Sequence, residues 1–212
     1  MTKTSIRLLP DEKPAPRTSH IPYHCALQWR PIIGSVILNK PAVSIFVTQK
    51  AYIRFCAHAS SNLQNEVGGW LLGKWRLDKT SGEQFIVIDT ILPALHTQSG
   101  SAFLTFTQES QVALHHHLEE SYPTKQLVGW FHTHPKMGVF LSAYDTWLHQ
   151  NFFPEQWQVA LVIEPFSRAG GFFIRQSDGQ MDPRHYFGFH ELINGKKKKR
   201  SVVFWRNIIA IS

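Results

Sequence analysis

The sequence has little cysteine, with only Cys25 and Cys56 among its 212 residues. Two thiols are too few for a disulfide framework, which argues against the class of small secreted proteins that disulfides hold together. Neither cysteine lies in a CxxC pair or at a spacing typical of a metal site, and we interpret both as small buried side chains. We therefore expect a protein of a reducing compartment, with a cytoplasmic location.

Long apolar runs are also absent. No stretch approaches the roughly 20 apolar residues that a membrane-spanning helix needs. The first residues, MTKTSIRLLPDEKPAPRTS, contain no uninterrupted apolar core of the kind found in signal peptides. The sequence therefore predicts no membrane partner.

Charge is sparse and unevenly placed. Charged residues make up 17% of the chain, and the formal net charge is +7. Much of the excess lies in the run Lys196–Arg200, without which the chain is nearly balanced. Such a run at a domain end is typical of a solvated tail, so we expect no nucleic-acid partner. Binding of this run to nucleic acid or an acidic surface stays open as the alternative.

From residue 42 onward, strand-like and helix-like patterns alternate, which predicts an α/β fold with a mixed sheet flanked by helices in one domain over residues 41–190. Residues 1–40 carry scattered prolines and are predicted to be an N-terminal extension, part disordered and part packed on the domain. Residues 191–212 are predicted to form a basic and apolar C-terminal tail. The predicted strands are 42–47, 67–77, 83–92, 103–107, 126–132, 157–165 and 170–177, and the predicted helices are 48–60 (with Thr48 as N-cap), 107–122 and 146–153.

Two histidines, His132 and His134, stand at the end of the predicted strand 126–132. Alternate strand residues project from the same face, so both imidazoles can point at one site. Pro135 breaks the strand, which places the pair at its rim. Catalytic zinc takes three nitrogen or oxygen ligands and keeps a fourth position for water, and Asp145 on the following helix supplies the third. The two histidines stand at the end of a strand, beside a sheet that can accept an extended peptide as an added strand.

The segment Ser142-Ala-Tyr-Asp145 also has a second interpretation. Ser142 and Asp145 match a capping box, with Ser142 as the N-cap of the helix and Asp145 at the third helical position. Both interpretations can hold for Ser142, whereas they compete for the carboxylate of Asp145.

In combination, these residues form H-x-H-x7-S-x2-D, which resembles the JAMM motif of the MPN-domain (Mov34/PAD-1, JAB) zinc metalloproteases. The stretch VGWFHTHPKMGVFLSAYDTWLHQNFF is similar to the corresponding stretch of deubiquitinase-like members. Upstream, Asn65–Gly73 resembles the E-x-x-G-x-L-x-G element of the family, and QVALVIEP resembles its strand that ends in an acid-proline pair. The resemblance covers roughly residues 42 to 180.

The resemblance implies a zinc ion held by His132, His134 and Asp145, with Glu66 as the general base and Ser142 as a donor to the oxyanion. It implies an isopeptidase or peptidase that cuts after the C-terminal glycine of ubiquitin or a ubiquitin-like modifier, whose conjugates would be the partners. The compact build resembles prokaryotic members, some of which accompany ubiquitin-like conjugation enzymes in bacterial anti-phage systems.

The chain departs from its eukaryotic relatives at Val139-Phe140, where they usually carry Cys-Trp, and at Lys136, where they carry Gly. These loop positions bear on substrate preference more than on metal binding. Two other functions stay open: a catalytically silent MPN scaffold subunit, disfavoured because all five site positions are filled, and a nucleic-acid-associated protein like the RadC branch, which the basic run would favour.

Other residues invite a functional interpretation less strongly. Adjacent helix positions point about 100° apart, so His115–His117 are predicted to lie on a solvated helix face. His149 is predicted to have a surface or packing role. Phe204-Trp205 with the nearby isoleucines is predicted to dock either on the domain or on a partner. Because the predicted site lies within residues 66–145, the tail has no chemical role in it.

Overall fold

The computed structural model describes residues 15–32, 41–94, 97–99, 104–106, 108–193 and 200–211. Its elements in chain order are β1 (Arg17–Ser19), a 3-10 turn (Tyr23–Cys25), β2 (Ala26–Pro31), β3 (Ser44–Thr48), α1 (Gln49–Ala59), β4 (Gly68–Asp78), β5 (Gln84–Pro93), β6 (Thr97–Ser99), β7 (Leu104–Phe106), α2 (Gln108–Glu120), β8 (Gln126–Thr133), α3 (Ala143–Phe152), β9 (Val159–Glu164), β10 (Ala169–Phe173), β11 (Phe189–Leu192) and β12 (Ile208–Ile211). Among these described residues, no helix combines the length and apolarity that crossing a bilayer requires.

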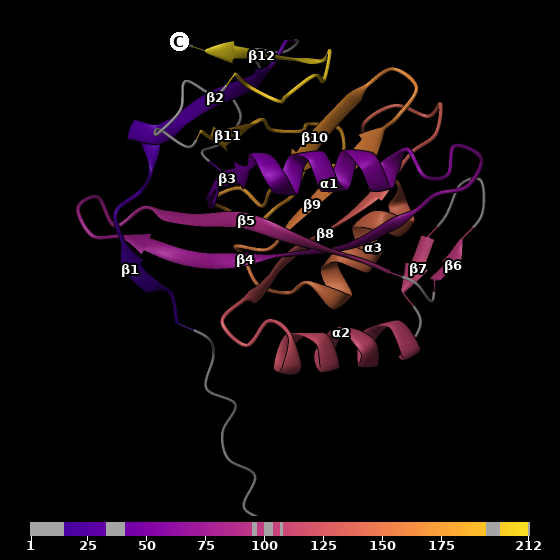
Figure 1. Ribbon diagram of the computed structural model, residues 1–212, viewed down its shortest axis with the longest axis horizontal. Helices are drawn as coiled ribbons and strands as arrows, with labels where there is room; N and C mark the ends of the chain where they lie inside the picture. Colours follow the sequence, from indigo (N-terminus) through magenta and orange to yellow (C-terminus); the bar gives the residue numbers. More distant parts are fainter. Residues whose placement is uncertain are drawn as a thin grey trace, which may run out of the picture.

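A mixed ten-stranded sheet forms the centre of the molecule (Figure 1). Its order is β10-β9-β8-β4-β5-β3-β11-β2-β12, and β1 pairs with β4 outside that order, while β6 and β7 form a separate pair. The parallel neighbours are β8–β9, β3–β5, β3–β11 and β1–β4, and the other pairs are antiparallel. The predicted fold class, an α/β domain with a mixed sheet flanked by helices, is confirmed.

Apolar side chains cover both faces of the sheet. α1 lies across the near face in Figure 1 and buries Tyr52 and Phe55 in one core cluster. On the opposite face, Leu114 of α2 and Leu148 of α3 belong to a second cluster together with Trp130. Because successive strand residues point to opposite faces, a single strand contributes side chains to both core clusters. The side of the sheet that carries Trp130 is also the side on which the candidate site forms.

The elements predicted from residue 42 onward are present with shifted ends, and the strand predicted over 170–177 already ends at Phe173 in β10. The Oγ1 atom of Thr48 accepts a hydrogen bond from the amide of Ala51 at 3.2 Å, which is the N-cap contact that the sequence predicts for α1. Likewise α3 begins after Ser142, although it starts at Ala143 rather than at residue 146.

Strands from both ends of the chain join the same sheet. β2 lies between β11 and β12, and the boundary predicted at residue 190 falls inside β11. Trp205 and Ile208 are each 4% exposed and belong to the core cluster under α1, so this part of the apolar end docks on the domain, whereas Phe204 and Ile209 are exposed. Residues 1–14, 33–40 and 196–199, which include most of the predicted basic run, lie outside the described residues.

Candidate metal centre

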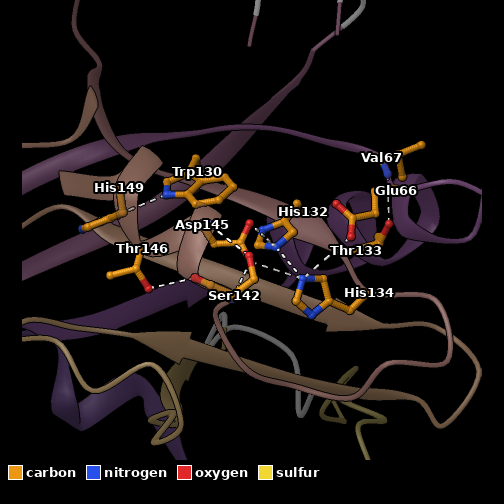
Figure 2. A network of polar contacts seen from close by, with 10 residues as sticks. All are labelled: Glu66, Val67, Trp130, His132, Thr133, His134, Ser142, Asp145, Thr146 and His149. Carbon is orange, nitrogen blue, oxygen red and sulfur yellow. Dashed lines mark hydrogen bonds and ion pairs between the residues drawn. The ribbon is translucent and has the colours of Figure 1, made fainter. Parts of the chain in front are cut away.

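Three neighbouring elements bring the predicted site residues together (Figure 2). His132 lies near the end of β8, and His134 follows directly after that strand. Asp145 occupies the first turn of α3. Glu66 precedes β4, which pairs with β8 so that Gly68 stands opposite His132. Side chains from the end of β8, from the first turn of α3 and from the segment before β4 therefore meet in one place.

The reactive atoms of these side chains converge. The Nε2 atoms of His132 and His134 are 2.9 Å apart. The two carboxylate oxygens of Asp145 lie 3.3 Å from Nε2 of His132 and 3.4 Å from Nε2 of His134. An oxygen of Glu66 lies 3.9 Å from Nε2 of His134. All four residues are buried, with 0–3% of their surface exposed.

The chemistry of this donor set fits a zinc ion. One ligand atom from each of Glu66, His132 and His134 lies within 4.8 Å of the others, which makes a group able to hold a metal ion. Two Nε2 atoms that face each other cannot both carry a proton without repulsion, whereas two lone pairs can bind one cation. Neutral imidazole nitrogen and carboxylate oxygen are the ligands that catalytic zinc takes. Within the described part of the chain, Glu66 also keeps a buried carboxylate oxygen without a hydrogen-bond partner.

The two carboxylates differ in their distance from the imidazoles. Asp145 contacts both Nε2 atoms at 3.3 and 3.4 Å, whereas the contact of Glu66 with His134 is longer, at 3.9 Å. Both carboxylates are therefore within reach of the imidazoles, and Asp145 is the nearer of the two.

Asp145 takes part in a capping box and faces the histidines at the same time. Its Oδ2 atom accepts a hydrogen bond from the Ser142 amide at 2.7 Å, and Ser142 Oγ accepts one from the Asp145 amide at 3.1 Å. The other oxygen, Oδ1, is the one nearest to His132. A carboxylate has enough lone pairs to serve both. The two interpretations of Ser142-x-x-Asp145 are therefore compatible, because the cap fixes the carboxylate in the orientation that faces the histidines.

The protonation equilibria of the two carboxylates differ in direction. Burial raises the pKa of Glu66 to about 7, an effect that His134 opposes and the charge of Asp145 reinforces. Burial also acts to raise the pKa of Asp145, but the contacts with His132, His134 and Ser142 outweigh it and hold this pKa below its ordinary value. Burial lowers the pKa of His132 despite the nearby Asp145. The cluster thus combines an ionised carboxylate, a neutral imidazole and a second carboxylate that titrates near neutrality.

Sequence reasoning missed the residues that hold Glu66 in place. The amide of Thr133 donates to the carbonyl of Val67, and the amide of Val67 donates to Oγ1 of Thr133, both at 2.9 Å. Thr133 is fully buried between the two histidines. The strand alternation was a usable signal, because the residue between His132 and His134 must point to the opposite side.

Trp130 packs against His132 and is itself hydrogen-bonded to His149. The Trp130 ring stacks on His132, with ring centroids 4.6 Å apart and planes 9° apart, and its Nε1–H donates to Nδ1 of His149 at 3.1 Å. Burial lowers the pKa of His149 to about 3. Of the two roles predicted for His149, at the surface or in packing, the structure shows packing, since the residue is 1% exposed. The predicted solvated face at His115–His117 is also confirmed, since all three residues are exposed on α2.

Comparison with known proteins gives a consistent family match. The family model described as JAB1/Mov34/MPN/PAD-1 ubiquitin protease matches residues 41–156. COP9 signalosome complex subunit 5 of Candida albicans is 29% identical over 128 residues, which are 57% of this chain and 20% of that protein. Ubiquitin carboxyl-terminal hydrolase RPN11 of Saccharomyces cerevisiae is 24% identical over 131 residues, which are 60% of this chain and 40% of that protein. The chain thus spans less than half the length of these relatives.

Among solved structures, a protein of Desulfitobacterium hafniense matches with a TM-score of 0.52 and 21% identity. The match covers 73% of this chain and 95% of that one, so it supports the fold over most of the domain.

Proposed function

Because the chain belongs to the JAB1/Mov34/MPN/PAD-1 ubiquitin protease family, whose model matches residues 41–156, we propose that it is a zinc-dependent isopeptidase or peptidase. Its proposed substrates are conjugates of ubiquitin or a ubiquitin-like modifier, cut after the modifier's C-terminal glycine. The observation that carries the proposal is the convergence of two imidazoles and two carboxylates in one buried cluster. A scaffold subunit without activity would have no need to keep four such groups together at the cost of burying them.

The proposed ligands are His132, His134 and Asp145. Zinc held there supplies Lewis-acid chemistry: it polarises the scissile carbonyl and makes water a stronger nucleophile near neutral pH. The capping box with Ser142 fixes Asp145 before any metal binds, because both of its hydrogen bonds lie within the first turn of α3. The stacked Trp130 ring limits the rotation of His132 in the same way.

Glu66 is the proposed general base. It accepts a proton from the attacking water while the water oxygen bonds to the carbonyl carbon, and it passes that proton to the leaving amine as the carbon–nitrogen bond breaks. A pKa of about 7 suits both steps, because the group gains and loses a proton with similar ease near neutrality. Its reach to His134, at 3.9 Å, places it beside the proposed ligands.

Ser142 is the proposed donor to the oxyanion of the tetrahedral intermediate. Its hydroxyl lies at the start of α3, and it already accepts the amide of Asp145 through the oxygen. A hydroxyl can accept one hydrogen bond and donate another. The N-terminal end of a helix also favours nearby negative charge.

The preference for glycine rests on crowding beside the scissile carbonyl. β8 is paired on both sides, with β4 and β9, so a peptide that adds a strand to the sheet, as the sequence suggests, would have to pair with an edge other than β8. The proposed ligands are almost completely buried, and bulk beside the scissile carbonyl would exclude the attacking water. A flexible tail that ends in glycine meets this demand, and the modifier's globular body adds affinity that a free peptide lacks. The setting in a bacterial conjugation system stays a prediction, which neighbouring reading frames would test.

The test is a panel of linear fusions treated with the zinc-loaded protein. The panel contains ubiquitin, related modifiers with Gly-terminal tails, the same tails with the last glycine changed to valine, and an unrelated unfolded protein. We expect cleavage only after the glycine, and loss of cleavage with a chelator or in Glu66→Gln. Digestion of the unfolded protein at many sites would instead indicate a general zinc peptidase. Zinc binding without turnover of any fusion would favour the silent scaffold.

A further inference from the structure

Hydrogen bonds connect the turn that follows His134 to the turn that follows β9, the strand next to β8. The amide of His134 donates to the carbonyl of Ile163 at 2.9 Å, and the amide of Met137 donates to the carbonyl of His134 at 3.2 Å. These bonds set the start of the turn. Its further course depends on Glu164, the last residue of β9, which runs parallel to β8.

Glu164 is a buried carboxylate with three backbone donors. Its Oε1 atom accepts the amide of Lys136 at 3.0 Å and the amide of Phe166 at 2.9 Å, and Oε2 accepts the amide of Ser167 at 2.7 Å. The side chain is 3% exposed. One carboxylate therefore joins the turn after the proposed ligand His134 to the turn between β9 and β10.

Lys136 adopts a backbone conformation that its residue type disfavours. Its φ angle is 63°, in the left-handed region, where a side chain costs roughly 1–2 kcal/mol. Two contacts hold it there: the amide bond to Glu164, and the ammonium group, which lies 4.9 Å from the centroid of the Phe166 ring. A strained residue persists only where its surroundings determine its conformation. Both contacts join Lys136 to residues at the end of β9 or in the turn that follows it.

We propose that Glu164 is a positioning residue for the metal centre: its carboxylate fixes the turn after His134 and so orients the His134 imidazole for zinc. The proposal rests on the proposed function for the identity of the metal. Residues that orient metal ligands from outside are worth about 10- to 100-fold in metal affinity or activity. Here the path runs through the backbone, from the carboxylate to the amide of Lys136 and from there to a ligand two residues earlier.

The isosteric change Glu164→Gln tests the role of the carboxylate. The amide group has one oxygen in place of two, and its NH₂ would face a backbone N–H, so at least one buried donor loses its partner. Glu191→Gln is the matched control, because Glu191 is also fully buried and accepts from Trp29 Nε1, Gln49 Nε2, Ser201 Oγ and the Val202 amide. Both variants lose one buried acceptor, but only Glu164 contacts the turn after His134.

Three measurements are made on each variant: the melting temperature, the zinc dissociation constant by competition with a chromophoric chelator, and amide hydrogen exchange of the metal-free protein. We expect both variants to melt at lower temperature than the wild type. Only Glu164→Gln should raise the zinc dissociation constant, by about 10-fold. Only this variant should speed exchange of the Lys136 amide, by about 10-fold.

Lys136→Gly tests whether zinc affinity depends on the backbone N–H of residue 136 or on the lysine side chain. Glycine keeps the N–H that Glu164 accepts and adopts a positive φ without strain, so zinc affinity should stay within about twofold of the wild type. If the glutamine oxygen takes the Oε1 position, the Lys136 amide keeps its acceptor and only the Ser167 amide loses one, so Glu164→Ala, which removes both oxygens, is measured in parallel. Unchanged zinc affinity and unchanged exchange of the Lys136 amide in both Glu164 variants would overturn the proposal and leave Glu164 a stabilising residue only. If no form of the protein binds zinc, the proposed function fails, while exchange of the Lys136 amide still decides whether Glu164 holds the turn.

Discussion

Glu66 and Asp145 are two carboxylates of one buried cluster whose pKa values move in opposite directions. Hydrogen bonds and two imidazoles stabilise the charge of Asp145. Glu66 lacks such donors on one of its oxygens, so burial dominates and raises its pKa to about 7. The difference is consistent with the proposed roles, because a metal ligand must be ionised and a general base must exchange protons.

The raised pKa of Glu66 predicts how the stability of the metal-free protein changes with pH. Between pH 4.5 and about 7 the folded protein keeps this proton while the unfolded chain has lost it. Stability should therefore fall as the pH rises through this window and level off above it. The fall is on the order of 3 kcal/mol, since each pKa unit corresponds to about 1.36 kcal/mol.

Urea denaturation in the presence of a chelator, at pH 5 and pH 7.5, measures this change. Glu66→Gln is the control, because its side chain does not titrate. The lowered pKa of His132 acts with the opposite sign, so the comparison of wild type and variant isolates the contribution of Glu66. Identical pH dependence in both proteins would contradict the prediction.

Removal of a single proposed ligand should abolish zinc binding. His132→Ala and His134→Ala each leave two of three ligands in a buried site, and we expect less than a tenth of the wild-type zinc content by elemental analysis. His116→Ala is the matched control, since His116 is exposed on α2. Full zinc occupancy in the double variant at 132 and 134 would show that the metal, if any, binds elsewhere.

Ser142 has a capping role and a proposed catalytic role, which a second N-cap separates. Ser142→Ala should cost about 1 kcal/mol of stability and lower kcat by about 10²-fold. Thr48→Ala removes the comparable cap of α1, so it should cost similar stability and leave kcat unchanged. Denaturation and steady-state kinetics on both variants test this. Equal kcat in the two variants would assign Ser142 to capping alone.

At the scale of elements, the approach of β4 to β8 is what carries Glu66 to the histidines. Gly68 stands opposite His132, and a Cβ atom on it would lie 2.3 Å from the carbonyl oxygen of Phe131. No side chain fits at that distance, so the two backbones can come this close only at a glycine. Gly68 falls on an unspecified position of the E-x-x-G-x-L-x-G resemblance, whose first glycine is Gly69. A Cβ atom on Gly69 would lie 2.3 Å from the carbonyl oxygen of Leu92, so that position also requires glycine for close backbone packing.

Gly68→Ala should therefore impair the site as well as the fold. We expect a loss of about 1–3 kcal/mol and at least a tenfold loss of activity, because the backbone that carries Glu66 must move away from β8. Gly82→Ala is the control: Gly82 has a φ of 70° in the β4–β5 turn, where an added methyl group would meet open space, so it should cost about 1–2 kcal/mol without affecting activity. Unfolding curves and turnover of a glycine-tailed fusion measure the two effects.

Local patterns in the sequence predicted the elements around the site and missed those that complete the sheet. β4, β5, β8 and β9 are apolar runs of strand length, and β8 ends at a proline-marked break, so each could be recognised alone. β2, β11 and β12 are short or mixed in polarity, and their partners lie far away in the chain. Glu191 illustrates the difficulty, because it is a buried carboxylate in β11 that only distant donors make favourable.

The residues of the candidate site could be predicted from the sequence, whereas the residues that hold them in position could not. His132, His134 and Asp145 share a short segment, and the strand alternation gives the direction of the two imidazoles. The dual role of the Asp145 carboxylate could not be foreseen, since it depends on which oxygen faces which partner. The contributions of Thr133 and Glu164 depend on pairings across the sheet, which spacing alone does not reveal.

At the scale of the whole molecule, the C-terminal segment is part of the core. Trp205 is 4% exposed, the amide of Phe204 donates to the Tyr52 hydroxyl at 3.1 Å, and β12 pairs with β2. The sequence suggested a tail without a chemical role, and the structure adds a structural one. This segment lies in the same core cluster as α1, on the face of the sheet opposite to Trp130 and the candidate site.

Trp205→Ala should destabilise the protein by about 3–5 kcal/mol, and deletion of residues 196–212 should do so more strongly. Below its melting temperature, the zinc-loaded Trp205→Ala protein should keep its specific activity, because the site lies in other elements. Phe204→Ala is the control, since Phe204 is 50% exposed and should cost less. Thermal unfolding with parallel activity assays tests both statements, and an unchanged melting temperature of Trp205→Ala would contradict the first.

The position of β2 in the sheet has a consequence during synthesis on the ribosome. β2 is made before its only sheet neighbours among the described strands, β11 and β12, and all the other described strands except β1 are made between them. The strands from β3 to β10 can pair before β11 and β12 are made, and this pairing brings Glu66 and Asp145 together. At that stage β2 has neither of its two neighbouring strands. A nascent chain thus exposes an unpaired strand near its N-terminal end until residues 189–211 have left the exit tunnel. During that interval, we expect exchange of β2 between neighbouring chains to compete with correct closure of the sheet.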